Sequence, residues 1–187
     1  MRAVRAEWTK LRTTPGTAWL LVLAAVTTVA ANHLGLSGVY VGQAPVAVVA
    51  VLTVSGEYSN GLIRTTLTAL PNRTTLMAAK AVVLSAVIGA VGSVSLLVVA
   101  PRAVVYLVLI AILSLGMAAV LRDSAVAVGA VLGLLYLPPI LTQLVANPHL
   151  RRLLEQSAPM SASLWALAAW SLGAMLVGTL LLRFRDT

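Results

Sequence analysis

Residue types that support metal-dependent or nucleophilic catalysis are scarce in this chain. Its 187 residues include five Asp and Glu, two His and no Cys. A zinc protease needs two histidines one helical turn apart and a third ligand. His33 and His149 instead stand far apart in predicted outer loops. Serines occur in apolar segments, but no His or Lys is placed to act as their base. The pattern favours neither a metal centre nor an intramembrane nucleophile, so we expect no enzyme activity.

One sequence motif, the P-loop, would indicate that this chain binds the phosphates of ATP. A P-loop holds phosphates with backbone amides and the Lys of a Gly-Lys-Ser/Thr sequence. No Gly-Lys pair occurs anywhere in the chain. We therefore expect no cofactor in this chain, and any ATP that drives its action must be bound by another.

Proton transport would require ionisable side chains deep in an apolar segment. The candidates Glu57, Arg122, Asp123 and Arg183 all lie at the predicted ends of such segments. At an end, a charged side chain can reach the interface or pair with a neighbour. The sequence therefore gives no support to a proton relay.

The elements that must position these residues are membrane-spanning helices. The composition is 60 % hydrophobic and 10 % charged, with a mean hydropathy of +0.99, whereas soluble domains carry about 25 % charged residues. Six spans of about 20 residues would use about 120 residues and leave no room for a second, soluble domain. The net charge of +8 flanks apolar runs, which favours anionic lipid over nucleic acid as its partner.

A basic amphipathic helix is predicted over residues 1–16. Val4, Trp8 and Leu11 recur at i, i+4 and i+7, while the basic residues point elsewhere. This spacing is typical of a helix lying in the headgroup plane, with Trp8 as its interfacial anchor.

Six apolar runs follow, and two of them allow a second interpretation. The runs cover residues 17–31, 39–54, 81–100, 103–121, 124–146 and 163–182. The first could also be a signal peptide cleaved after Ala31, and the third and fourth could form a re-entrant hairpin. Pro101-Arg102 is expected to be a tight turn, and Pro138-Pro139 is expected to break the fifth run. We predict an all-α integral membrane protein with six transmembrane helices in a single domain.

Orientation follows from the basic residues. With the N-terminus in the cytoplasm, ten of the 13 Lys and Arg residues fall on the cytoplasmic side, and Arg102, Arg151 and Arg152 fall outside. This asymmetry predicts cytoplasmic N- and C-termini.

Two predicted segments do not span the membrane. In the outer segment, residues 147–160, Asn147 can cap a short helix with Leu150 and Leu153 on one face. In the cytoplasmic segment, residues 56–80, Asn60 can cap another short helix. Its apolar face contains Leu62, Ile63, Thr66, Leu67 and Leu70. A short helix between two spans is suited to docking. Asn72 can cap a second helix that runs through Lys80 into the third span.

Three stretches together resemble the permease subunits of bacterial type-2 ATP-binding-cassette exporters. They are the entry helix around residues 6–13, the segment 55–67 continuing to residues 71–80, and the basic ends at residues 121–125 and 181–186. The middle stretch is the most specific, because it is similar to the cytoplasmic coupling segment of that family. The outer connections after the first and third spans are shorter than the family's, which makes the chain a compact form.

The resemblance implies a permease in the bacterial cytoplasmic membrane, working with a separate ATPase subunit that holds ATP and Mg²⁺. It implies a homodimer, or a heterodimer with a second permease. The coupling residues it implies are Glu57, Asn60, Leu62, Ile63, Arg64 and Leu67. The outer gate candidates it implies are Pro138, Pro139, Leu150 and Leu153.

Two other functions remain open on the sequence. An accessory or immunity protein that scaffolds other membrane components would use the same basic ends as ordinary interfacial anchors. A channel is a weaker alternative, because no acidic ring or filter-like sequence occurs. The substrate of a transporter is not specified by the apolar spans.

Overall fold

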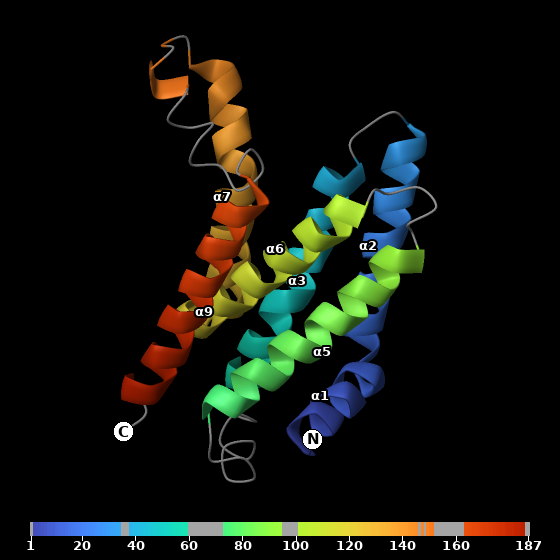
Figure 1. The fold of residues 1–187 in the computed structure, drawn as a ribbon, viewed down its shortest axis with the longest axis vertical. Helices are drawn as coiled ribbons and strands as arrows, with labels where there is room; N and C mark the ends of the chain where they lie inside the picture. Colours follow the sequence, from blue (N-terminus) through green and yellow to red (C-terminus); the bar gives the residue numbers. More distant parts are fainter. Residues whose placement is uncertain are drawn as a thin grey trace.

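The computed structural model describes residues 2–34, 38–59, 73–94, 101–145, 147, 149–151 and 163–185. Every labelled element within these ranges is an α-helix, so the all-α prediction is confirmed there. The helices of Figure 1 are α1 (Arg2–Thr13), α2 (Pro15–His33), α3 (Gly38–Ser59), α5 (Arg73–Val94), α6 (Pro101–Leu121), α7 (Ser124–Leu144) and α9 (Leu164–Arg185).

The helices have the length and surface of membrane spans. Five of those described, α3, α5, α6, α7 and α9, are long and apolar enough to cross a bilayer, and α2 joins them only as part of a bent pair with α1. Large apolar side chains face outward, including Trp19 at 73 % exposure and Trp165 at 86 %. Such surfaces are stable in hydrocarbon rather than in water. The chain is therefore a helical, multi-pass membrane protein.

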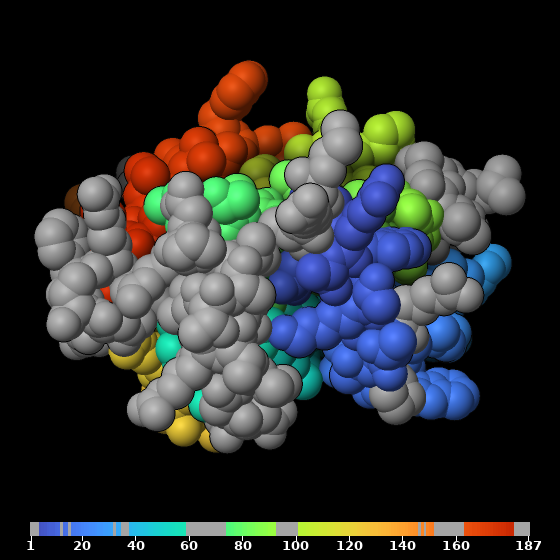
Figure 2. Space-filling model, turned by 90° about the horizontal axis from the view of Figure 1, so that it is seen from below, coloured from blue at the N-terminus to red at the C-terminus, as the bar shows by residue number. Residues whose placement is uncertain are grey.

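The sharp bend between α1 and α2 has a local cause. Pro15 begins α2, where its fixed φ and missing N–H are tolerated. Thr17 Oγ1 lies within hydrogen-bonding distance of both Leu11 O (3.0 Å) and Thr14 O (2.7 Å). These contacts satisfy carbonyls that the end of α1 leaves open. The two helices meet at 77°, and α1 lies across the lower end of the bundle (Figures 1 and 2).

The core lies along α3 and α6. α6 packs against α3, α5, α7 and α9, while α3 also contacts α2 and α7. Val49, Val51, Ile110, Leu113 and Leu115 are fully buried between these elements. In Figure 1, α2 and α5 lie to one side of this pair, and α7 and α9 lie to the other.

α5 runs from Arg73 to Val94, which confirms the helix expected to begin after Asn72 and to continue through Lys80 into the third span. Two other predicted features of the spans were wrong. Pro101 and Arg102 are the first residues of α6 rather than a turn, since proline suits the first helical position. Pro138 and Pro139 do not break the fifth span, because α7 is continuous from Ser124 to Leu144. Prolines are tolerated in membrane helices when local contacts replace the lost backbone bond.

Glycine allows a close backbone contact between α6 and α9. A Cβ on Gly116 would lie 2.6 Å from Ala174 C, and one on Gly178 would lie 2.9 Å from Gly116 O. The motif Gly129-x-x-x-Gly133 on α7 makes no such contact among the described residues, because a Cβ on Gly129 would meet nothing within 4 Å and one on Gly133 only Leu137 of its own helix. Whether a glycine allows two helices to pack closely thus depends on what the neighbouring helix places opposite it, and not on the Gly-x-x-x-Gly spacing alone.

Candidate functional site: a buried ion-pair cluster

Four charged side chains from three helices meet where α1 lies against the bundle. Glu7 and Lys10 come from α1, Glu57 from the last turns of α3, and Lys80 from α5. Lys80 Nζ lies 2.9 Å from Glu7 Oε2 and 2.7 Å from Glu57 Oε1. Lys10 Nζ also donates to Glu57 Oε1. We call these four residues the ion-pair cluster; two carboxylates and two ammonium groups leave it without net charge.

Lys80 is the central donor of the cluster. Its third hydrogen bond goes to the backbone oxygen of Thr53 at 3.0 Å, so all three ammonium protons have acceptors. The side chains of Lys80 and Glu57 are each 3 % exposed. Buried charges are tolerated only when they are paired and hydrogen-bonded. The cluster therefore fixes the positions of α1, α3 and α5 relative to one another.

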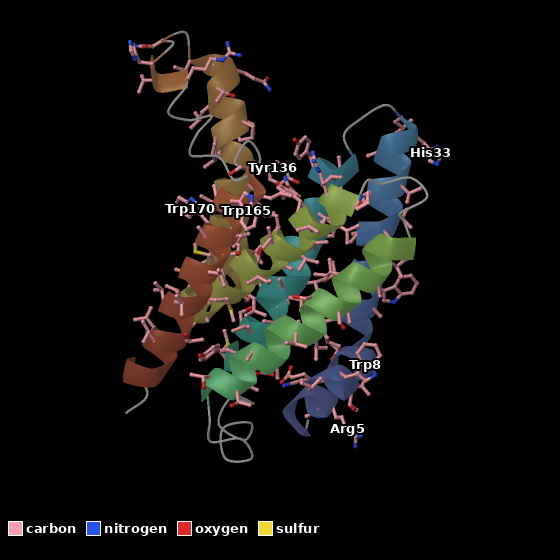
Figure 3. The ribbon with its side chains drawn as sticks, in the orientation of Figure 1. Arg5, Trp8, His33, Tyr136, Trp165 and Trp170 are labelled. Atoms are coloured by element: carbon pink, nitrogen blue, oxygen red, sulfur yellow. The ribbon has the colours of Figure 1, made fainter. Side chains whose placement is uncertain are left out.

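The orientation of α1 explains how its charges reach the bundle. Glu7 and Lys10 are three residues apart and so share one side of the helix. Glu7 is buried, whereas Val4 and Trp8 are exposed. Figure 3 shows Arg5 and Trp8 on the outer side of α1. An apolar edge directed outward fits a helix at the membrane surface, with Trp8 available as an interfacial anchor.

One carboxylate oxygen of the cluster is left over. Both lysines bond Glu57 Oε1, while Oε2 is buried and has no hydrogen-bond partner among the described residues. Glu57 also lines a cavity between α1, the start of α2 and α3, with about 170 Å³ of space for water-sized groups. An unpaired buried carboxylate oxygen is costly unless something donates to it.

A second contact holds the neighbouring residue Tyr58. The guanidinium carbon of Arg122, in the turn between α6 and α7, lies 5.3 Å from the centre of the Tyr58 ring. Arg122 adopts a left-handed backbone with φ of 60°, and its N–H bonds Ala118 O at 2.9 Å. Cations over aromatic rings attract each other at this range. Two consecutive residues of α3 therefore link it to α1, to α5 and to the turn between α6 and α7.

Tyrosine side chains link α3 to α6 and to α7 in the halves of these helices that lie away from the ion-pair cluster. Tyr106 donates to Gln43 Oε1 at 2.6 Å, and Tyr136 donates to Tyr40 O at 2.6 Å. The Tyr40 and Tyr106 rings meet edge to face with centroids 6.4 Å apart. This polar contact lies in the same region of α7 as the predicted gate.

The structure describes only some of the residues that the sequence analysis selected. Glu57 belongs to the ion-pair cluster. Pro138 and Pro139 lie inside α7, and Leu150 is exposed in a helical turn where Asn147 Oδ1 accepts from His149 N–H at 3.0 Å. The selected residues outside the described ranges are Asn60, Leu62, Ile63, Arg64, Leu67 and Leu153.

The sequence analysis missed Glu7, Lys10 and Lys80 as members of one site. Lys80 was expected in a helix running into the third span, and it lies in α5. Its pairing with Glu57 and Glu7 was not predicted. The available signal was the acidic Glu7 in an otherwise basic helix, because an isolated opposite charge often has a partner. That signal does not identify the partner, which lies 73 residues away.

No protein-family model matches the chain, and no match is found among curated proteins. The functional interpretation therefore rests on the chain's own residues. Chemically, the cluster contains two carboxylates and two ammonium groups, whose charge-assisted hydrogen bonds hold the helices together.

Proposed function

We propose that the chain is the permease subunit of an ATP-driven exporter, of the type-2 ATP-binding-cassette class that its sequence resembles. The anchoring of segment 60–72 supports the proposal. Glu57 precedes this segment and Lys80 follows it, and their side chains pair at 2.7 Å. Lys10 and Glu7 connect the same pair to α1. Force applied to the segment would therefore act on α1, α3 and α5 together.

The contact between Tyr58 and Arg122 extends this connection to the turn between α6 and α7. A displacement at the end of α3 would reach α7, whose other half contains Pro138 and Pro139. Packed helices transmit motion in this way, as rigid elements shifting against one another. Glu57 acts in this proposal from within the cluster, while residues of segment 60–72 dock on the partner.

The ATPase partner binds ATP and Mg²⁺, and its nucleotide-driven closure pushes on the docking helix around residues 60–70. The permease works as a homodimer or as a heterodimer with a second permease. It has six spans with both termini in the cytoplasm, in the bacterial cytoplasmic membrane. The cargo is an amphipathic or hydrophobic compound.

The test is purification of the tagged chain from its native membrane in mild detergent. Mass spectrometry of the co-purified proteins and an ATPase assay are then carried out on the same sample. We expect a stoichiometric cassette ATPase, which is lost with Arg64→Glu or Leu67→Pro. Arg102→Glu is the matched control, because Arg102 is exposed at the start of α6.

The accessory or immunity role gives the opposite result. The chain would then purify without an ATPase, and the Arg64 and Leu67 variants would behave like Arg102→Glu. Reconstituted vesicles would show no ATP-dependent flux. That outcome would overturn the permease proposal.

A further inference from the structure

The helix α7 packs against the bundle along only part of its length. Its buried residues are Ala127, Val131 and Leu135, in the part of α7 that packs on α3 and α6. No described residue of α7 after Leu135 is buried, and Leu144 in the last turn is 75 % exposed. We call residues 137–144 the α7 arm. Figure 1 shows this end of α7, in orange, standing apart from α2, α3 and α6.

Two backbone hydrogen bonds are missing where this packing ends. In an α-helix each N–H donates to the carbonyl four residues earlier, but Pro138 and Pro139 have no N–H. The carbonyls of Leu134 and Leu135 therefore do not receive this bond, although the helix is continuous here. Proline is a common position of helix bends. Packing and backbone bonds thus end at the same place, so the arm can tilt without disturbing the packed part of α7.

A side-chain hydrogen bond joins α7 to α3 directly before the prolines. The Tyr136 hydroxyl donates to the backbone oxygen of Tyr40 at 2.6 Å. Tyr40 lies in the first turn of α3, and its ring packs edge to face on Tyr106 of α6. Tyr106 is itself buried and bonded to Gln43 at 2.6 Å. The acceptor is therefore held by the core, whereas the donor lies between the packed part of α7 and the arm.

We propose that the α7 arm pivots about Pro138 and Pro139, and that the hydrogen bond from Tyr136 to Tyr40 latches it. When the bond is made, the residues next to the pivot stay against α3 and the tilt of the arm is restricted. When the bond is broken, the arm takes a second position. In a bilayer the apolar surface of the arm favours neither position, because hydrocarbon covers it as well as protein does. The pivot belongs to this chain alone and does not depend on the exporter function.

The test measures distances between pairs of spin labels by pulsed electron paramagnetic resonance on the purified chain in lipid nanodiscs. The chain has no Cys, so each pair is attached to two introduced cysteines. The arm pair is Leu144→Cys with Val105→Cys, and the control pair is Val126→Cys with Val105→Cys. Val105 lies near the start of α6 and Val126 in the packed part of α7, and all three side chains are at least half exposed. We expect two distances for the arm pair and one for the control pair.

Two variants should change the arm distances in opposite directions. Tyr136→Phe removes the hydroxyl and keeps the ring, so the population of the second distance should rise about fivefold, as expected for the loss of one hydrogen bond. The double variant Pro138→Ala with Pro139→Ala restores two backbone donors and should leave one distance. Tyr40→Phe is the matched control, because Tyr40 accepts through its backbone oxygen and keeps the latch.

Three results would overturn the proposal. One is the same arm distances in the wild type, in Tyr136→Phe and in the double alanine variant, as expected for a rigid α7. Another is an equal change in Tyr40→Phe, which would assign the effect to the ring contact. The third is an equal change of the control pair in Tyr136→Phe, which would mean that α7 moves as a whole. If the double alanine variant does not fold, the comparison of Tyr136→Phe with Tyr40→Phe still decides.

Discussion

Lys80 shows how much of the α1 attachment depends on one side chain. It donates to Glu7, Glu57 and the Thr53 carbonyl, and it is 3 % exposed. Lys10 donates to the same Glu57 but is 37 % exposed. Because solvent screens exposed pairs and not buried ones, the two lysines should differ strongly in their contribution to stability.

We expect Lys80→Met to lower the free energy of unfolding by about 3 kcal/mol or more, because two buried carboxylates lose their shared cation. Lys10→Met should cost about 1 kcal/mol or less, since Lys80 still pairs with Glu57. The measurement is unfolding in detergent, followed by tryptophan fluorescence. Equal losses in both variants would contradict the central role of Lys80.

Arg122 combines an unfavourable backbone with a favourable side-chain contact. Its φ of 60° is costly for residues with a Cβ, while its guanidinium lies over the Tyr58 ring. Arg122→Ala loses the contact and keeps the strain, whereas Arg122→Gly loses the contact and also relieves the strain. We expect the glycine variant to be more stable than the alanine variant by about 1 kcal/mol in the same unfolding assay. A more stable alanine variant would argue against backbone strain.

At the scale of elements, the contact of α6 with α9 depends on the absence of side chains. A Cβ on Gly116 would lie 2.6 Å from the backbone of Ala174, so Gly116→Ala must push the helices apart. We expect a loss of about 1–3 kcal/mol in unfolding free energy. Gly129→Ala is the matched control on α7, where the added Cβ meets nothing within 4 Å. It should gain about 0.5–1 kcal/mol from helix propensity.

For the whole molecule, the helix directions predict which positions share a side of the membrane. Thr13 ends α1, and Asp123 follows Arg122, which contacts Tyr58 at the end of α3 that also meets α1. His33 ends α2, at the end of the bundle away from α1 (Figure 3), and Asn147 follows the last turn of α7. The chain contains no Cys, so single cysteines can be placed at these four positions. In intact cells an impermeant maleimide should label the His33 and Asn147 variants and leave the Thr13 and Asp123 variants unlabelled until lysis. Labelling of the cysteine at position 123 in intact cells, together with labelling of the one at position 33, would contradict the topology.

The sequence predicted the helices better than it predicted their contacts. Apolar runs located α2, α3, α6, α7 and α9 to within a few residues, because the bilayer requires a long uncharged stretch. The polar residues before Ala81 belong to α5, as the helix predicted after Asn72 requires. The sequence analysis wrongly expected the paired prolines to break α7, because hydropathy and proline content do not show whether neighbouring groups support the backbone.

The amino-acid sequence by itself determined a helical membrane protein with a surface helix at its start, because hydropathy and helical periodicity are local properties. Only the tertiary structure decided that Glu7 and Lys80, 73 residues apart, share one buried contact. It also decided that Gly116, rather than Gly129, lies at a helix contact. Pairing of charges and close approach of backbones depend on which faces meet, and that information is not carried by any single segment.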